Sequence, residues 1–367
     1  MNILVNSGRV TPFLETRNKL IKRIIKNEHN VTLTGFQTGY ENEIEKIGAS
    51  FVEMPVNRAG LNPLRDLKLV LKYFKLIKKS KIHLVHSYTI KPNIYGSIAA
   101  RLAGVKQIYP TINGLGYAYT GNDFKNRIVR IVTSILYKVA FSCSTKVFFQ
   151  NSDDAREMVN RHLIRPEKCV VIAGSGIDLV KFCEIEQPEK FSFIMVTRLL
   201  KSKGVYEYLE AARIVKGKYN DIEMYLVGPI DPNPNGVKEE ELQAFIDEGI
   251  INYLGVSTEV HKLLGRSSVF VLPSYYREGV PHSILEAMAT GRAILTTDSP
   301  GCRETVKNGI NGFLVPTKDS KALSEKMIWM IENQTAVKEM GKESLIYAKE
   351  RFDVKMVNEH LMSTMEI

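Results

Sequence analysis

Short apolar segments alternate with longer amphipathic segments along most of the chain. The short segments predict two series of strands. These span Ile3–Asn6, Val31–Gly35, Leu84–His86, Gln107–Thr111 and Lys146–Phe149, followed by Phe191–Thr197, Glu223–Val227, Ile251–Leu254, Val269–Leu272, Ala293–Thr296 and Gly312–Val315. Helical spacing of apolar residues predicts helices between them, among them Thr16–Asn27, Val205–Lys216 and Ser320–Glu332. Strands that alternate with helices indicate parallel sheets covered by helices on both faces.

The two series of strands predict two α/β domains. The pattern breaks between Gly174 and Pro188, so we expect an N-terminal domain of residues 1–182 and a C-terminal domain of residues 183–351. A chain of 367 residues is long enough for two such cores. Ligands bind doubly wound sheets at the carboxyl ends of the strands. Two domains that face each other with these ends predict a ligand-binding cleft.

Cysteine usage and the N-terminus indicate a reducing compartment. The four cysteines are scattered, and no Cys/His cluster has the spacing of a zinc site. The first residues, Met1–Val5, predict a strand instead of a signal peptide. No apolar run reaches the roughly 18 residues that a membrane span requires.

Charge is distributed unevenly between the two halves of the chain. Residues 1–182 hold 28 Lys/Arg and 13 Asp/Glu, a net charge of +15, whereas the remaining residues hold 22 and 27, a net charge of −5. The basic half indicates either a solvated face or an anionic partner, which can be a membrane surface, a phosphate-bearing acceptor or nucleic acid. No zinc finger, RNP motif or basic zipper occurs, so nucleic acid is not an expected partner.

Two predicted helices of the basic half, Arg65–Lys81 and Lys125–Phe141, carry apolar residues at helical spacing among lysines and arginines. Helices of this kind can lie on an anionic bilayer, where each cation near the surface contributes about 1 kcal/mol. Alternatively, each is a core-facing helix with a solvated basic face. Because both occur in the same basic half, we favour an anionic membrane surface as a partner.

The loop and helix around Pro281 carry the strongest chemical signal. Gly279 lets the backbone approach a ligand, and Pro281 suits the first turn of a helix. The amides of residues 280–283 would then form an anion site at the helix N-terminus. Glu286, one turn into the helix, can bond two neighbouring hydroxyls, and Glu278 lies in the preceding loop. A diphosphate with a sugar at each end fits this pattern; the alternative is a capped surface helix with two solvated glutamates.

A second motif follows the predicted strand Phe191–Thr197. Arg198 and Lys203 both can reach an anion at the carboxyl end of that strand. They predict stabilisation of a departing diphosphate, with an ordinary basic loop as the alternative. No Asp-x-Asp occurs in the chain, so we expect neither a metal nor a cofactor.

A third motif, Thr296–Val306, predicts a strand, a tight loop and a short helix that shape the cleft. Its Cys302 has no His or Asp placed locally as a partner for a nucleophile, so we expect a structural role.

In combination these motifs resemble family 4 of the GT-B glycosyltransferases, and most closely its capsule and lipid-linked-oligosaccharide branch. The resemblance rests on Arg198…Lys203-Gly204, Glu278…Glu286-Ala287-Met288-Ala289 and Pro300-Gly301-Cys302-Arg303-Glu304, and in the first half on His86-Ser87-Tyr88-Thr89-Ile90-Lys91-Pro92, Ala99–Gly104 and Thr111–Tyr117. It implies an α/β fold of the GT-B class, with two Rossmann-like doubly wound domains facing across a cleft. It also implies that residues 352–367 cross back to the N-terminal domain as a helix.

The family pattern implies roles for individual donor-side residues. Glu286 is expected on the nucleotide ribose, Arg198 and Lys203 on the diphosphate, and Glu278 beside the donor sugar. The remaining donor contacts are expected from the loop, the helix start and the turn after the first strand, namely Gly279, Val280, Pro281, His282, Ser283, Ile284, Ser7 and Gly8.

On the acceptor side, the resemblance implies that Arg17, which opens the next helix, meets an acceptor phosphate and that Lys91 binds the acceptor. Asn113 occupies the position of a donor-contacting His in many family members. An amide takes no proton at neutral pH, but in a front-face retaining mechanism the departing phosphate can receive the acceptor's proton. His86 is expected to be structural, and His282 to add a pH-dependent contact to the diphosphate.

The resemblance thus implies a retaining, metal-independent glycosyltransferase. We expect it to move a hexose or N-acetylhexosamine from a UDP-sugar to a polyprenyl-diphosphate-linked sugar, at the cytoplasmic face of the membrane, in surface polysaccharide or glycan assembly. Two alternatives come from other classes. One is a non-catalytic sugar-nucleotide-binding subunit, which Asn113 favours. The other is a nucleotide-sugar epimerase, which would need no lipid acceptor and no basic membrane face.

Overall fold

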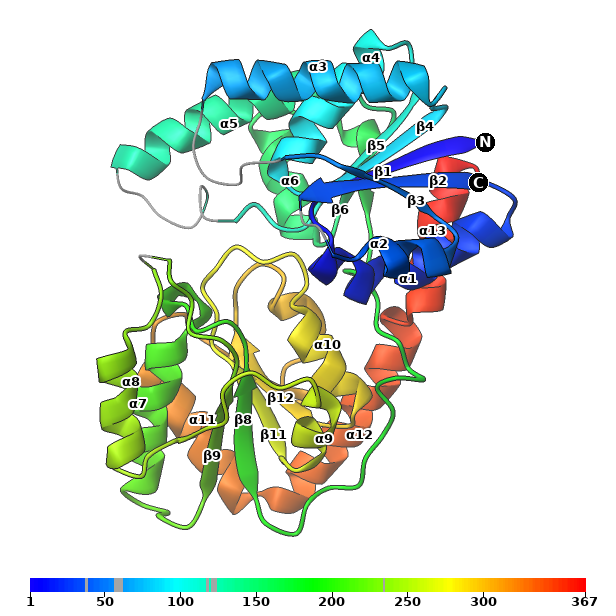
Figure 1. The fold of residues 1–367 in the computed structure, drawn as a ribbon. Coiled ribbons are helices and arrows are strands. Elements are labelled where there is room, and N and C mark those ends of the chain that lie inside the picture. The colour runs from blue at the N-terminus through cyan, green and yellow to red at the C-terminus, as the bar shows by residue number, and fades with distance from the viewer. Residues whose placement is uncertain (37–38, 56–61, 117–118, 120–123, 234) are drawn as a thin grey trace. The chain divides into compact units, whose positions relative to one another are not determined.

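The chain forms two compact units in a computed structural model that describes residues 1–367 except 37–38, 56–61, 117–118, 120–123 and 234 (Figure 1). Unit 1 comprises Met1–Ser175 together with Val354–Ile367, and unit 2 comprises Gly176–Asp353. The boundary therefore lies at residues 175–176, and the last helix belongs to the first unit.

Unit 1 contains a parallel sheet with the strand order β3-β2-β1-β4-β5-β6-β7. Its strands are β1 (Asn2–Arg9), β2 (Asn30–Phe36), β3 (Ser50–Glu53), β4 (Leu84–Tyr88), β5 (Gln107–Ile112), β6 (Val147–Phe149) and β7 (Cys169–Val171). The helices are α1 (Thr11–Lys26), α2 (Glu41–Ile47), α3 (Pro63–Lys79), the π-helix η1 (Pro92–Gly96), α4 (Ser97–Leu102), α5 (Phe124–Cys143), α6 (Ser152–Asn160), the 3-10 helix η3 (Pro166–Lys168) and α13 (Val354–Met365).

Two hydrophobic cores cover the two faces of this sheet. On one face α3, α4, α5 and α6 bury residues such as Tyr73 and Phe141. On the other face α1, α2 and α13 form the second core, in which Leu361 of α13 and Ile24 of α1 are buried together. Figure 1 shows this three-layer arrangement. The buried apolar face of α13 explains why the end of the chain belongs to unit 1.

Unit 2 repeats the architecture with the strand order β10-β9-β8-β11-β12-β13, again all parallel. Its strands are β8 (Ser192–Val196), β9 (Glu223–Val227), β10 (Asn252–Tyr253), β11 (Val269–Leu272), β12 (Ala293–Thr297) and β13 (Gly312–Val315). Its helices are η4 (Lys201–Lys203), α7 (Val205–Lys216), α8 (Glu239–Asp247), α9 (Val260–Gly265), α10 (His282–Ala289), η5 (Arg303–Thr305), α11 (Ser320–Glu332) and α12 (Gln334–Arg351).

The strands and helices differ from the sequence-based expectation at a few places. Strands β3 and β7 were not predicted. Both are short edge strands without a fully buried residue; β3 begins and ends with polar residues, and β7 is an apolar strand of only three residues. Helix α1 begins at Thr11 instead of Thr16, since Phe13 and Leu14 are buried and extend its apolar face. The expectation that Arg17 opens this helix was therefore wrong. Arg17 lies in its second turn.

None of the helices within the described ranges is both long and apolar enough to cross a membrane.

Candidate active site

Three loops at the carboxyl ends of β8, β11 and β12 converge in unit 2. Gly204, which follows η4, has φ +80°, and a Cβ there would lie 2.1 Å from the carbonyl oxygen of Pro273 after β11. Gly301, after β12, has φ +80°, and its Cβ would lie 1.8 Å from the Gly279 oxygen. Only glycine permits contacts this close at positive φ. The two glycines therefore hold the outer loops against the central loop that carries Glu278.

Lys203 and Glu278 form an ion pair where these loops meet. Their side chains are 13% and 11% exposed. Ser274 Oγ also donates a hydrogen bond of 3.2 Å to Glu278 Oε1. The ammonium of Lys203 lies 5.5 Å from the centre of the Tyr276 ring. The structure thus brings together two residues that lie 75 positions apart in the sequence, and it places a shielded cation at the carboxyl edge of the sheet.

Arg198 lies just beyond β8 on the same edge. Its Nη1 donates to Asp231 Oδ2 at 3.1 Å, and its side chain is 54% exposed. An exposed ion pair of this kind contributes little to stability, so the guanidinium can exchange partners at small cost.

Helix α10 begins one residue later than expected, because Pro281 is its N-cap with ψ 117° and His282 is its first residue. The first-turn amides of a helix have no acceptor within the helix, so those of His282 and Ser283 lie at an end suited to an anion. Glu286, one turn on, pairs with His282: Nδ1 and Oε1 lie 3.1 Å apart. Buried residues from Ile284 to Ala289 fix the helix in the core.

In unit 1 the predicted donor-side residues lie at the carboxyl ends of β1 and β5, two strands that β4 separates in the sheet. The expectation that Ser7 and Gly8 form a turn after the first strand was wrong, because β1 continues to Arg9 and includes both; Ser7 is buried. Asn113 follows β5, and its Oδ1 accepts a hydrogen bond of 3.2 Å from Gln150 Nε2, which follows β6. This bond fixes the amide that replaces the common family histidine, and sequence reasoning gave no role to Gln150.

Arg17 is a buried cation in unit 1. It is 3% exposed, its Nη1 lies 3.4 Å from the Ser175 carbonyl oxygen, and its guanidinium carbon lies 5.0 Å from the centre of the Tyr88 ring. Within the described residues no carboxylate pairs with it. A buried charge is costly unless an opposite charge compensates it, so this geometry favours an anionic ligand.

Lys91, by contrast, already has a buried partner. Its Nζ lies 2.7 Å from Asp66 Oδ1, and the Tyr95 hydroxyl donates to Asp66 Oδ2 at 2.8 Å. Burial and the Asp66 carboxylate raise the pKa of Tyr95. This network ties η1 to α3, so it gives Lys91 a structural task. Its contact with an acceptor stays a prediction.

Two polar residues that follow β4 were not predicted as site residues. Thr89 has φ +68°, and its buried Oγ1 finds no hydrogen-bond partner within the described residues. The Oδ1 of Asn93, in η1, is likewise unpartnered there, although its Nδ2 donates to the Thr111 carbonyl at 2.8 Å. Unpaired buried oxygens and short π-helices are frequent at functional sites. The sequence carries no signal for the positive φ of Thr89, because a β-branched residue normally avoids positive φ.

His86 and Cys302 behave as buried structural groups. Burial, with the nearby Arg17 charge, lowers the pKa of His86 to about 3, so the ring is neutral at physiological pH. Its Nε2 lies 2.9 Å from Thr111 Oγ1. Burial, followed by the Glu278 charge, raises the pKa of the Cys302 thiol. A protonated thiol is a poor nucleophile.

In the part of the chain that the structure describes, no three or more His, Cys, Asp or Glu side chains are grouped so that they could hold a metal ion.

Comparisons with known proteins identify the family. Residues 180–345 match the model of Glycosyl transferases group 1, and residues 11–151 match that of Glycosyl transferase 4-like. An N,N'-diacetylbacillosaminyl-diphospho-undecaprenol alpha-1,3-N-acetylgalactosaminyltransferase of Campylobacter jejuni is 33% identical over 332 residues, which cover 87% of this chain and 86% of that protein. The chain is a GT-B glycosyltransferase of family 4.

Two further proteins resemble this transferase. A UDP-Gal:alpha-D-GlcNAc-diphosphoundecaprenol alpha-1,3-galactosyltransferase of Escherichia coli is 28% identical over 303 residues, covering 79% of this chain and 76% of that protein. The structure of Anabaena Alr3699/HepE in complex with UDP and glucose superposes with a TM-score of 0.78 at 18% identity, covering 100% of this chain and 99% of that chain. The predicted fold class and the predicted glycosyltransferase activity are thereby confirmed.

Proposed function

We propose that this transferase moves a hexose or N-acetylhexosamine from a UDP-sugar to a polyprenyl-diphosphate-linked sugar, with retention of configuration and without a metal. The observation that carries the proposal is the convergence of three carboxyl-end loops on Lys203 and Glu278. The names of the Campylobacter jejuni and Escherichia coli relatives specify diphospho-undecaprenol-linked acceptors, and the Escherichia coli name specifies a UDP-sugar donor.

The charges in unit 2 suit a nucleotide diphosphate. Arg198 and Lys203 supply two cations, and the start of α10 supplies backbone amides. Fixed positive charge in a shielded site stabilises the charge that develops on a leaving diphosphate. Glu278 keeps Lys203 at this position before the donor binds, and Glu286 suits the two ribose hydroxyls.

Proton transfer follows from the residues present. Asn113 cannot act as a base, and its Oδ1 already accepts a hydrogen bond from Gln150. We therefore assign the acceptor's proton to the departing phosphate, on the same face of the sugar from which the bond to UDP breaks. Attack on that face retains the configuration of the sugar.

Arg17 is suited to bind the diphosphate of the acceptor. Its guanidinium is buried beside Tyr88 without a carboxylate partner in the described residues. An acceptor phosphate would compensate this charge, and the planar guanidinium can bond two phosphate oxygens at once.

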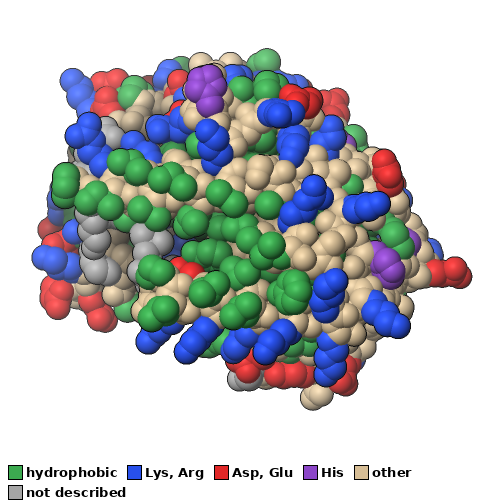
Figure 2. Space-filling view, turned by 90° about the horizontal axis from the view of Figure 1, so that it is seen from above, with side chains coloured by type: hydrophobic (Ala, Val, Ile, Leu, Met, Phe, Trp, Pro, Cys, Tyr) green, Lys and Arg blue, Asp and Glu red, His purple; other side chains and the backbone are tan. Residues whose placement is uncertain are grey.

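A membrane surface suits the face of unit 1 formed by α3, α4 and α5. Figure 2 shows hydrophobic side chains gathered on this face with lysines and arginines around them. The exposed apolar residues of these helices are Leu64, Leu67, Leu71, Leu102, Phe124, Ile128, Ile131, Ile135 and Val139. An apolar surface rimmed by cations favours an anionic bilayer. We assign peripheral binding at the cytoplasmic face, where the lipid acceptor is accessible.

The test is turnover of a panel of UDP-sugars in EDTA, with and without a polyprenyl-diphosphate sugar. We expect lipid-dependent UDP release from one donor. A requirement for added metal would contradict the metal-independent mechanism. Conversion of a sugar nucleotide without lipid would indicate an epimerase, and tight UDP binding without turnover of any UDP-sugar or GDP-sugar would indicate a binding subunit.

A further inference from the structure

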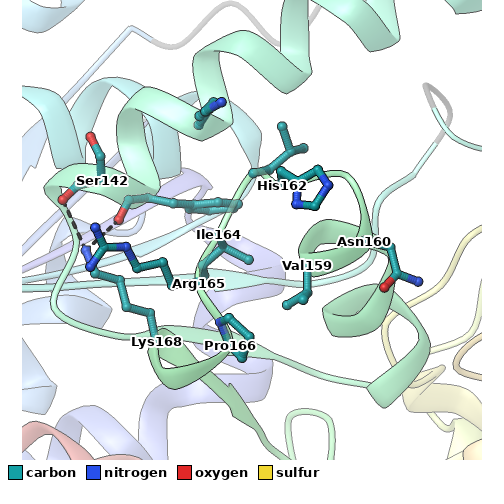
Figure 3. Close-up of a pocket in the computed structure, with 11 residues that line it drawn as sticks. Ser142, Val159, Asn160, His162, Ile164, Arg165, Pro166 and Lys168 are labelled. Atoms are coloured by element: carbon teal, nitrogen blue, oxygen red, sulfur yellow. Dashed lines mark hydrogen bonds between the residues drawn. The ribbon is translucent and has the colours of Figure 1, made fainter.

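A cavity of about 910 Å³ lies in unit 1 at the end of α5 (Figure 3). The last turns of α5 and α6 and the 3-10 helix η3 form its walls. Helix α5 ends just before β6, and η3 ends at the start of β7. The cavity therefore lies at the amino ends of these strands, whereas Ser7 and Asn113 lie at carboxyl ends of the same sheet. It is separate from the donor and acceptor residues described above.

The lining of the cavity is basic and apolar. The polar part includes Lys138, His162, Arg165 and Lys168, and the apolar part includes Phe141 and Ile164. All eleven side chains drawn in Figure 3 belong to the described chain, and none of them is a carboxylate. An anion with an apolar portion is the complementary ligand.

Among the basic side chains of the lining, Lys168 is already engaged, whereas Arg165 remains accessible. Lys168 Nζ donates to the carbonyl oxygens of Phe141, Ser142 and Ser144 at 3.0, 3.1 and 2.7 Å, so it caps α5 (Figure 3). Arg165 is 81% exposed, and its Nη1 lies 3.9 Å from Glu167 Oε1, beyond hydrogen-bonding distance. Such a contact contributes little to stability, so Arg165 is available for a stronger anionic partner.

The cavity continues the exposed apolar row of α5. Ile128, Ile131 and Ile135 are exposed along the helix. Ser142, which lines the cavity, follows Ile135 by seven residues and so lies on the same face; Lys138 is one residue before exposed Val139. A lipid beneath this face would have its headgroup beside the cavity.

We propose that this cavity binds the phosphate headgroup of an anionic membrane lipid, with the phosphate at Lys138 and Arg165 and the start of the lipid chain against Phe141 and Ile164. This inference rests on the proposed membrane-facing role of α5. It adds a specific lipid site to that surface, at a distance from the transfer site.

The first experiment measures binding of the full chain to a short-chain phosphatidylglycerol kept below its micelle-forming concentration. We expect saturable binding, at least tenfold weaker binding of inorganic phosphate, and none of a short-chain phosphatidylcholine. Absence of saturable phosphatidylglycerol binding overturns the proposal. Equal affinity for inorganic phosphate overturns it as well, because the cavity would then be a site for free anions.

Variants separate the cavity from general surface charge. Lys138→Gln/Arg165→Gln should weaken lipid binding about tenfold or more, given the contribution of each cation near an anionic surface. The control Lys22→Gln/Lys26→Gln removes the same charge from α1, on the opposite face of the sheet. It should change the affinity for the lipid less than threefold. Equal effects of the two pairs contradict a specific site.

A cavity-filling variant tests the location without changing charge. Val159→Trp should abolish short-chain lipid binding while its thermal melting curve stays cooperative, and Asn160→Trp serves if Val159→Trp does not fold. Unchanged binding in a folded filled variant contradicts the proposal. Transfer to a soluble short-chain acceptor should be unaffected in all these variants. If the wild type binds lipid but transfers no sugar, the proposed function fails and the lipid site stands.

Discussion

At the residue scale, the charged residues of unit 2 that we propose to bind the donor already have polar or charged partners. Lys203 pairs with Glu278, and Glu286 with His282. In the proposed site, a bound donor would replace these partners. The desolvation of Lys203 is therefore largely complete before binding, which keeps the site organised for a leaving diphosphate.

Glu286→Gln tests the ribose contact. The amide keeps the shape of the side chain but loses its charge, so UDP affinity should fall about 10- to 100-fold, the scale of hydrogen bonds to a charged group. Isothermal titration with UDP measures this. Glu343→Gln, an exposed glutamate of α12, is the matched control and should leave affinity unchanged. Equal affinity of Glu286→Gln and wild type would remove Glu286 from the donor site.

Arg17→Gln tests the acceptor side. Because the buried guanidinium lacks a carboxylate partner among the described residues, its removal should raise the KM for the lipid acceptor at least about tenfold while UDP affinity stays constant. Arg23→Gln, in the same helix and paired with Glu359, serves as the control. A loss of UDP affinity instead of acceptor affinity would contradict the assignment.

The sequence predicted which residues carry charge at the strand ends but not their partners. Asp231 lies 33 residues from Arg198, and Asp66 lies 25 residues from Lys91. Such pairs depend on how loops and helices pack, which residue type and spacing do not determine. The positive φ of Thr89 escaped prediction for the same reason, because tertiary contacts impose it.

At the element scale, the strands of unit 2 were all predicted, whereas the two edge strands of unit 1 were not. Val269–Leu272 and Gly312–Val315 match β11 and β13, which are largely buried. An interior strand of a doubly covered sheet requires an apolar run, which a single sequence displays. β3 and β7 contact solvent at the edges of the unit 1 sheet; β3 has polar residues at both ends, and the apolar β7 is only three residues long.

The exposed apolar face of α5 leads to a prediction about membrane binding. Ile131 and Ile135 are 61% and 60% exposed, so Ile131→Glu/Ile135→Glu should reduce binding to anionic vesicles at least about tenfold by removing the apolar area that enters the bilayer. Co-sedimentation measures the loss. The control, Val256→Glu/Ile310→Glu, adds the same charge to exposed positions of unit 2. If both pairs lower binding equally, α5 does not face the membrane.

Arg292 organises the elements of unit 2 beneath the site. It is fully buried and donates to carbonyl oxygens of Ile185, Glu186, Leu264, Gly265 and Gly291. Burial lowers its pKa to about 10. Arg292→Lys leaves several of these carbonyls unpaired and should lower the free energy of unfolding by about 3 kcal/mol, measured by urea denaturation. Arg266→Lys, at an exposed neighbour, should have little effect. A similar stability for both variants would contradict this role.

At the scale of the whole molecule, the charge difference between the halves matches a division of tasks. The basic half carries the cation-rimmed apolar face and Arg17, and the other half carries Lys203, Glu278 and the other residues that we propose to bind the donor. Two α/β units and their parallel sheets followed from the sequence pattern, whereas the arrangement of charges around each site depends on packing between segments that are distant in the sequence.

The central claim is tested most directly by the configuration of the product. The chain is incubated in EDTA with its UDP-α-sugar and a short-chain polyprenyl-diphosphate sugar, and the purified product is examined by NMR. We predict one new α-glycosidic linkage on the lipid-linked sugar, in an amount equal to the UDP released. A β-linkage, or release of UDP without a lipid-linked product, would contradict the account.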